Sequence, residues 1–111
     1  MGLLQGVHEI GERVGLRLLS FGHAGDGNVH VNLMKDDLPD DLWQECLTEA
    51  QRELYHLALS LGGTITGEHG IGATRRGYLA EAIGPEAVAI MRTIKDAIDP
   101  LGIMNPQKVF A

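Results

Sequence analysis

Glycine is concentrated in two short windows of this chain, and this clustering constrains the fold more than any other feature. Nine of the fifteen glycines lie within residues 22–27 and 62–77. Such segments make poor helix or strand interiors, because glycine loses more conformational freedom on folding than any other residue. The windows also contain His23 and His69, and His30 follows the first closely. Glycines interleaved with histidines and carboxylates favour a backbone that bends tightly around a site.

Hydrophobic periodicity predicts three helices and three strands. Apolar residues recur at helical spacing over residues 3–14, 41–61 and 85–98. Apolar or alternating segments that are typical of strands cover residues 16–21, 28–34 and 64–67. The order helix, strand, strand, helix, strand, helix indicates an α+β domain with a small antiparallel sheet and helices packed on one face.

The expected strand at residues 28–34 has two different faces, because polar and apolar residues alternate along it. Its polar face carries Asn28, His30 and Asn32. Its apolar face carries Val29, Val31 and Leu33. A loop of five or six residues, which includes His23, joins it to the preceding strand and predicts a hairpin. Polar side chains on an open strand face can meet a ligand without costly burial.

Charge and composition exclude several classes of protein. Nine basic and fifteen acidic residues give a formal net charge of −6, which argues against a nucleic-acid binder, because such proteins show a basic surface. No stretch approaches the ~18 consecutive apolar residues that a membrane span needs. Cys46 is the one cysteine, so no intramolecular disulfide can form, and we expect a cytoplasmic location.

Two imidazoles and one carboxylate are a common ligand set for a catalytic divalent metal with open coordination positions. The residues that supply this set here are His23, His30 and Glu68. Neutral imidazole suits Zn, Fe and Mn, and the open positions accept a substrate. The alternative is structural: His23 would stabilise a turn and His30 would face solvent as an ordinary strand residue.

His69 follows Glu68 directly and lies within a glycine-rich segment. With a reference pKa of about 6.5, a neutral histidine next to a metal-bound hydroxyl can accept its proton near neutral pH. A purely structural histidine is the other interpretation. Asn32 shares the strand face of His30 and either binds substrate or acts as a structural amide.

Three segments carry a family resemblance: FGHAGDGNVHVN at residues 21–32, GEHGIG at 67–72 and DPLGIMNP at 99–106. They resemble the C-terminal cap domain of FAD-linked oxidases. That family includes the glycolate oxidase flavin subunit, D-lactate dehydrogenases and D-2-hydroxyglutarate dehydrogenase. The resemblance covers nearly the whole chain and implies a partial ferredoxin-like cap domain.

The resemblance also implies a role for each candidate residue. The implied ligands of the divalent metal are His23, His30 and Glu68. Asn32 would bind the substrate, His69 would act as the catalytic base, and Asn105 would lie near the flavin. Family members usually continue Asn-Pro-Gly-Lys, whereas Gln107 takes the place of that glycine here, so the path of the tail is open.

The implied activity is the FAD-dependent oxidation of a 2-hydroxy acid, such as glycolate or D-lactate, to the 2-oxo acid. The sequence contains no FAD-binding domain, so we expect residues 1–111 to be a C-terminal fragment of the cap domain that holds no FAD and is inactive alone. We also expect self-association, because such a fragment exposes strand edges and apolar surface. The alternative is a stand-alone metal-binding or interaction module without catalysis.

Overall fold

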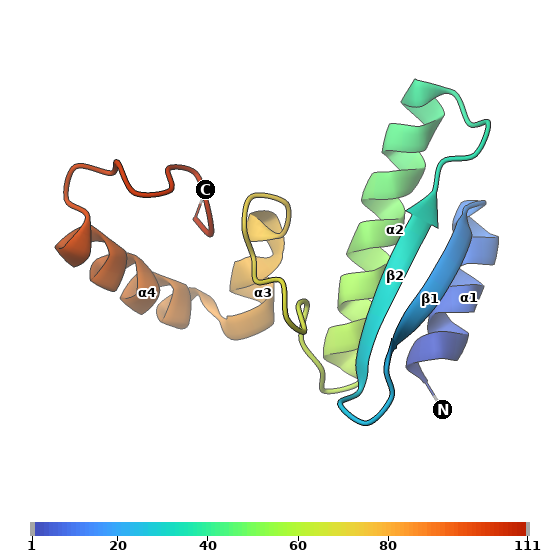
Figure 1. The fold of residues 1–111 in the computed structure, drawn as a ribbon, viewed down its shortest axis with the longest axis horizontal. Helices are drawn as coiled ribbons and strands as arrows, with labels where there is room; N and C mark the ends of the chain where they lie inside the picture. Colours follow the sequence, from blue (N-terminus) through green and yellow to red (C-terminus); the bar gives the residue numbers. More distant parts are fainter. Residues whose placement is uncertain (1, 111) are drawn as a thin grey trace. The chain divides into compact units, whose positions relative to one another are not determined.

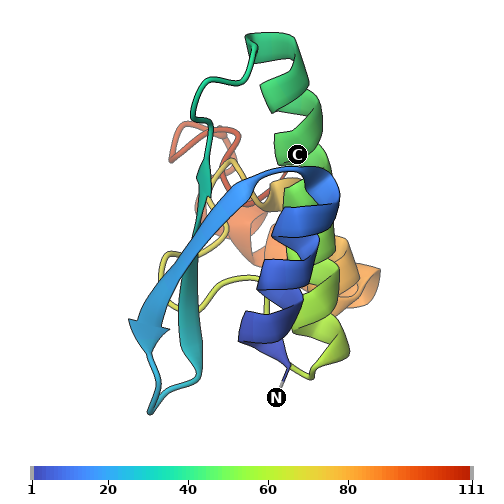
Figure 2. The same cartoon turned by 90° about the vertical axis from the view of Figure 1, so that its right-hand side faces the viewer.

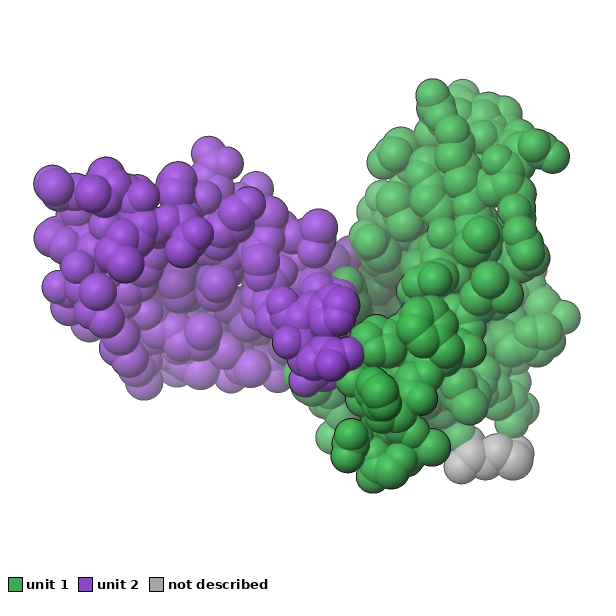
Figure 3. Space-filling view, in the orientation of Figure 1, with its two compact units in different colours: residues 1–64 green, residues 65–111 purple. Residues whose placement is uncertain are grey.

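The computed structural model of the chain describes residues 2–110. The chain divides between residues 64 and 65 into two compact units, which Figure 3 colours separately. Unit 1 contains helix α1 (Leu3–Val14), strands β1 (Arg17–His23) and β2 (Asn28–Met34), and helix α2 (Asp40–Ser60). Unit 2 contains the short 3-10 helix η1 (Arg76–Tyr78) and helices α3 (Leu79–Ile83) and α4 (Pro85–Ile98), as Figure 1 shows.

In unit 1, helices α1 and α2 lie side by side on one face of the β1–β2 hairpin (Figure 2). Two glycines of α1 allow this close packing. A Cβ atom on Gly6 would lie 2.6 Å from Leu57 of α2, and one on Gly11 would lie 2.9 Å from the carbonyl oxygen of Leu16. A side chain at Gly11 would collide with this backbone oxygen, whereas one at Gly6 would displace the end of the Leu57 side chain. The buried apolar residues of this unit are Val7, Ile10, Leu16 and Ala50.

The hairpin is longer, and its loop shorter, than the sequence predicts. Strands β1 and β2 pair antiparallel up to His23 opposite Asn28, which leaves a turn of residues 24–27. His23 thus ends a strand, and its predicted place in a loop is wrong. Gly22 explains the error: a Cβ atom there would lie 2.0 Å from the carbonyl oxygen of Asn28. This glycine marks the close approach of two strands and not a turn.

The strand predicted at residues 64–67 is also wrong, because this segment is irregular. Both strands that the structure describes belong to unit 1. A strand needs a neighbouring ladder to satisfy its backbone groups, and the described part of unit 2 offers none. The sheet is therefore a two-stranded antiparallel hairpin covered by helices on one face, and the predicted α+β class is confirmed.

In unit 2, Gly84 separates α3 from α4. It adopts a φ of +86°, which ends the first helix, and Pro85 begins the second as predicted. The apolar stripe of α4 is left open by its own unit, since Ile90, Ile94 and Ile98 are 64%, 56% and 69% exposed. None of the helices within residues 2–110 combines the length and the apolar character that crossing a membrane requires.

Candidate metal and substrate site

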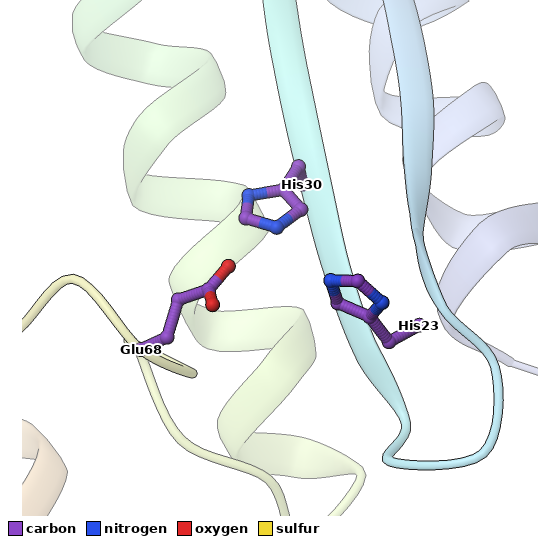
Figure 4. A group of neighbouring side chains, drawn as sticks. All are labelled: His23, His30 and Glu68. Carbon is purple, nitrogen blue, oxygen red and sulfur yellow. The ribbon is translucent and has the colours of Figure 1, made fainter.

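The two histidines of the hairpin lie on the same face of it. His23 ends β1 and His30 lies within β2, and Figure 4 shows both imidazole rings on one side of the strands. Their centroids are 6.3 Å apart, and the rings meet edge to face. His23 is exposed and His30 is half-buried. An ion or small molecule from solvent can therefore reach the pair.

Phe21 belongs to this face and was missed by the sequence reasoning. It lies directly opposite His30 in the register of the hairpin. Its ring stacks on the imidazole with 5.1 Å between centroids and 20° between planes. Phe21 is 58% exposed although it is apolar. The signal was present in the sequence, since alternation along β1 places Phe21 and His23 on one face.

Asn32 lies two residues after His30 in β2 and therefore on the same face of the strand. It stands opposite Leu19 in the hairpin register and is exposed. The predicted polar face of the strand at residues 28–34 is therefore present in the structure. It displays an imidazole and an amide next to each other, which can accept and donate hydrogen bonds to a polar ligand.

Glu68 and His69 belong to unit 2 and form a pair of their own. A carboxylate oxygen of Glu68 lies 3.6 Å from Nε2 of His69, and both side chains are exposed. The turn that carries them contains Gly70 and Gly72 with φ values of +72° and +55°, a left-handed conformation that glycine adopts without strain. Figure 4 draws Glu68 on this irregular segment and the histidines on the hairpin.

The structure thus brings the sequence-predicted residues together as two pairs. His23 and His30 are neighbours in unit 1, and Glu68 and His69 are neighbours in unit 2. That His23, His30 and Glu68 bind one metal together, with His69 as the base beside it, stays a prediction.

Asn105 lies in a tail that folds back within unit 2. Its φ is +48°, and those of Gln107 and Val109 are +62° and +64°. The N–H of Val109 donates to the carbonyl oxygen of Gly72 at 2.7 Å, which places the tail against the end of the Glu68–His69 turn. Gln107 therefore occupies a backbone conformation that suits glycine.

A buried carboxylate anchors the start of this tail. Asp99 accepts hydrogen bonds from the backbone N–H groups of Ile103 at 3.0 Å and Met104 at 2.9 Å, and it also pairs with Lys95. The hydrogen bond from Lys95, together with those two N–H groups, holds the pKa of Asp99 below its ordinary value, although burial acts in the opposite direction. The charged form of Asp99 is thus part of the folded state.

Comparison with known proteins adds a family to this geometry. The family model for the C-terminal domain of FAD linked oxidases matches residues 1–109. The chain belongs to this family. The resemblance seen in the three sequence segments is therefore confirmed over almost the whole chain.

Named enzymes are among the relatives of this FAD-linked oxidase domain. The chain is 45% identical to a D-lactate dehydrogenase of Archaeoglobus fulgidus over 92% of its own length and 22% of the relative. It is 38% identical to glycolate oxidase subunit GlcD of Bacillus subtilis over 98% of its length and 23% of that protein. It is 40% identical to a D-2-hydroxyglutarate dehydrogenase of Stutzerimonas stutzeri over 82% of its own length and 20% of that protein. The chain spans about a fifth of the length of these relatives.

Proposed function

We propose that this chain is the metal- and substrate-binding part of an FAD-dependent oxidoreductase that converts a 2-hydroxy acid into the 2-oxo acid. The names of the relatives support the substrate class, since lactate, glycolate and 2-hydroxyglutarate each carry a hydroxyl group beside a carboxylate. The observation that carries the proposal is the pair of imidazoles, His23 and His30, on an open hairpin face. Residues 1–111 then act as a C-terminal fragment of the cap domain, with FAD bound largely by a domain outside this sequence.

The proposed ligands of a divalent metal, zinc, manganese or iron, are His23, His30 and Glu68. They offer two imidazole nitrogens and one carboxylate oxygen, a donor set that suits these metals and leaves positions open for substrate. The exposed positions of His23 and Glu68 fit a ligand that arrives from solvent. When bound, the metal supplies Lewis acidity toward the substrate hydroxyl, and FAD supplies the hydride acceptor.

The remaining polar residues would bind the substrate and move its proton. His69, as a neutral imidazole, accepts the hydroxyl proton on a ring nitrogen. A carboxylate oxygen of Glu68 lies 3.6 Å from Nε2 of that ring, so the proposed base and one proposed metal ligand are neighbours. The amide of Asn32 donates a hydrogen bond to a substrate oxygen from the hairpin face. Asn105 would contribute to binding the flavin.

A metal-binding module without catalysis is the second candidate. It is favoured by one observation, namely that the His23–His30 pair is formed entirely within unit 1. This pair could bind a metal without a flavin domain. The cytoplasmic location expected from the lone cysteine stays a prediction.

Calorimetric titration of zinc into the chain tests the metal site. His30→Ala removes one of three proposed ligands and should lower zinc affinity by at least about tenfold, since even outer partners of a metal ligand contribute that much. His56→Ala is the matched control, because His56 is an exposed histidine of α2 that is not among the proposed ligands and lines a hollow with Gly6 and Arg13 of α1. Equal affinity of the unaltered chain and His30→Ala contradicts the proposed site.

A chimera tests the oxidoreductase function directly. This chain would replace the aligned C-terminal part of the Bacillus subtilis glycolate oxidase subunit, to which it is 38% identical over 109 residues. We expect D-lactate or glycolate to bleach the flavin absorbance of the FAD-loaded chimera, and His69→Asn to slow bleaching by at least about a hundredfold. An FAD-loaded chimera that no 2-hydroxy acid reduces contradicts the proposal and favours the module without catalysis.

A further inference from the structure

The turn of residues 68–72, which includes the proposed base, has little structure of its own. It belongs to no helix or strand, and Gly70 and Gly72 adopt left-handed φ values of +72° and +55°. Glycines are the residues with the most freedom to lose when a turn is ordered. Two carbonyl groups of the turn are held locally, because Arg75 donates its side chain to Gly70 and its backbone N–H to Ile71. Contacts from outside the turn are therefore needed to fix its far end.

One such contact comes from a distant part of the chain. The N–H of Val109 donates to the carbonyl oxygen of Gly72 at 2.7 Å. Val109 makes this bond with a φ of +64°, which a β-branched residue rarely adopts. The N–H of Phe110 donates to the carbonyl of Lys108 at 2.7 Å and closes a strained three-residue turn around Val109. Strain of this kind persists only where surrounding contacts hold it.

Two arginines of unit 2 hold the tail on either side of Val109. Arg76 donates from Nη1 to the carbonyl oxygen of Gln107 at 2.9 Å. The guanidinium of Arg92 lies over the ring of Phe110, 4.9 Å from its centroid. Arg76 lies four residues after Gly72, the last residue of the turn. Its side chain therefore links the turn to the tail segment that returns to it.

We propose that Arg76 is a positioning residue for the turn of residues 68–72. By holding the carbonyl of Gln107, it presents the N–H of Val109 to Gly72 and so fixes the end of the turn that carries the base. The importance of this positioning for catalysis rests on the proposed function, whereas the contacts of Arg76 are independent of it. A charged donor suits the task, because its hydrogen bond is stronger than a neutral one and offsets the strained backbone at Gln107 and Val109.

Amide hydrogen exchange, followed residue by residue by NMR in the whole chain, tests this role. Arg76→Met keeps an unbranched side chain and removes the guanidinium donors. We expect exchange at Val109, whose N–H donates to Gly72, to become about tenfold to a hundredfold faster, the change that loss of one hydrogen bond to a charged group produces in an opening equilibrium. Arg76→Lys keeps a cationic donor and should restore part of the protection. Arg52→Met is the control, because it removes the same charge from an exposed position of α2.

Zinc affinity of the same variants is measured separately by calorimetry. The proposal predicts weaker zinc binding in Arg76→Met than in Arg52→Met, and recovery in Arg76→Lys. Unchanged exchange at Val109 in Arg76→Met overturns the proposal, and so does an equal loss of zinc affinity in Arg76→Met and Arg52→Met. If the unaltered chain binds no zinc, the proposed metal site fails, and the exchange result alone then decides the role of Arg76.

Discussion

Phe21 covers one face of the His30 ring. The two rings are stacked with centroids 5.1 Å apart, from residues that lie directly opposite each other in the hairpin. The stacking limits the orientations that the imidazole can adopt, so His30 is partly oriented for metal binding before the metal arrives. Orienting a ligand in this way lowers the entropy that metal binding costs.

This relationship predicts that Phe21→Ala weakens zinc binding although Phe21 contributes no ligand atom. Aromatic pairs are worth about 0.5–1.5 kcal/mol beyond buried area, so we expect the dissociation constant to rise about threefold to tenfold. Leu19→Ala, at an exposed apolar position of the same face, should leave it nearly unchanged. An equal effect of both substitutions would show that general hairpin stability, and not the stacking, is responsible.

His69→Ala should leave zinc affinity within about twofold of the unaltered chain, because we assign His69 a proton-transfer role and not a ligand role. The same substitution in the FAD-loaded chimera should abolish most flavin reduction. Calorimetry and flavin absorbance measure the two effects separately. A loss of zinc affinity as large as that of His30→Ala would show that His69 is a metal ligand.

Gln107→Gly should stabilise unit 2. Gln107 has a φ of +62°, where a side chain costs about 1–2 kcal/mol relative to glycine. The extra freedom of glycine in the unfolded chain offsets about 0.4–1 kcal/mol of that gain. The expected net gain is about 0.5–1 kcal/mol, measured by urea unfolding. Gln44→Gly, at an exposed position of helix α2, should instead destabilise the chain by about 1 kcal/mol.

The folded state should lose stability in acid through Asp99. The pKa of Asp99 in the folded state is lowered by Lys95 and two backbone N–H groups. Its contribution to the free energy of unfolding is therefore complete above the unfolded pKa of about 3.9. That contribution disappears as the pH falls through the lower pKa of the folded state. Asp99→Asn should be less stable than the unaltered chain near pH 6, and the difference should shrink below about pH 4. Urea unfolding between pH 6 and pH 2 measures this. A difference that is constant over the whole range would mean that the charge of Asp99 is not involved.

We predict that the chain self-associates through the open stripe of α4, formed by Ile90, Ile94 and Ile98. An exposed apolar patch of this kind favours contact with a second copy. Ile94→Glu should shift the species seen by light scattering toward the monomer at high concentration. Thr93→Glu adds the same charge at the adjacent exposed position and should not. A clean monomer for the unaltered chain would contradict this prediction.

Most of the secondary structure could be predicted because it is encoded locally. The helices at residues 3–14 and 85–98 and the strand at 28–34 have the predicted bounds, since each depends on periodicity within its own segment. The strand at residues 64–67 could not be assessed in this way, because a strand needs a partner and the sequence does not say whether one is present. For the same reason Gly22, a residue of close strand approach, was taken for part of a loop.

The sequence by itself determined the family, the polar hairpin face and the candidate residues, because motifs and alternation are properties of neighbouring residues. Only the tertiary structure decided that Phe21 stacks on His30 and that Val109 reaches Gly72. These contacts join residues 9 and 37 positions apart. Their existence depends on strand register and on the path of the tail, which arise when many weak contacts are satisfied together and which no single segment encodes.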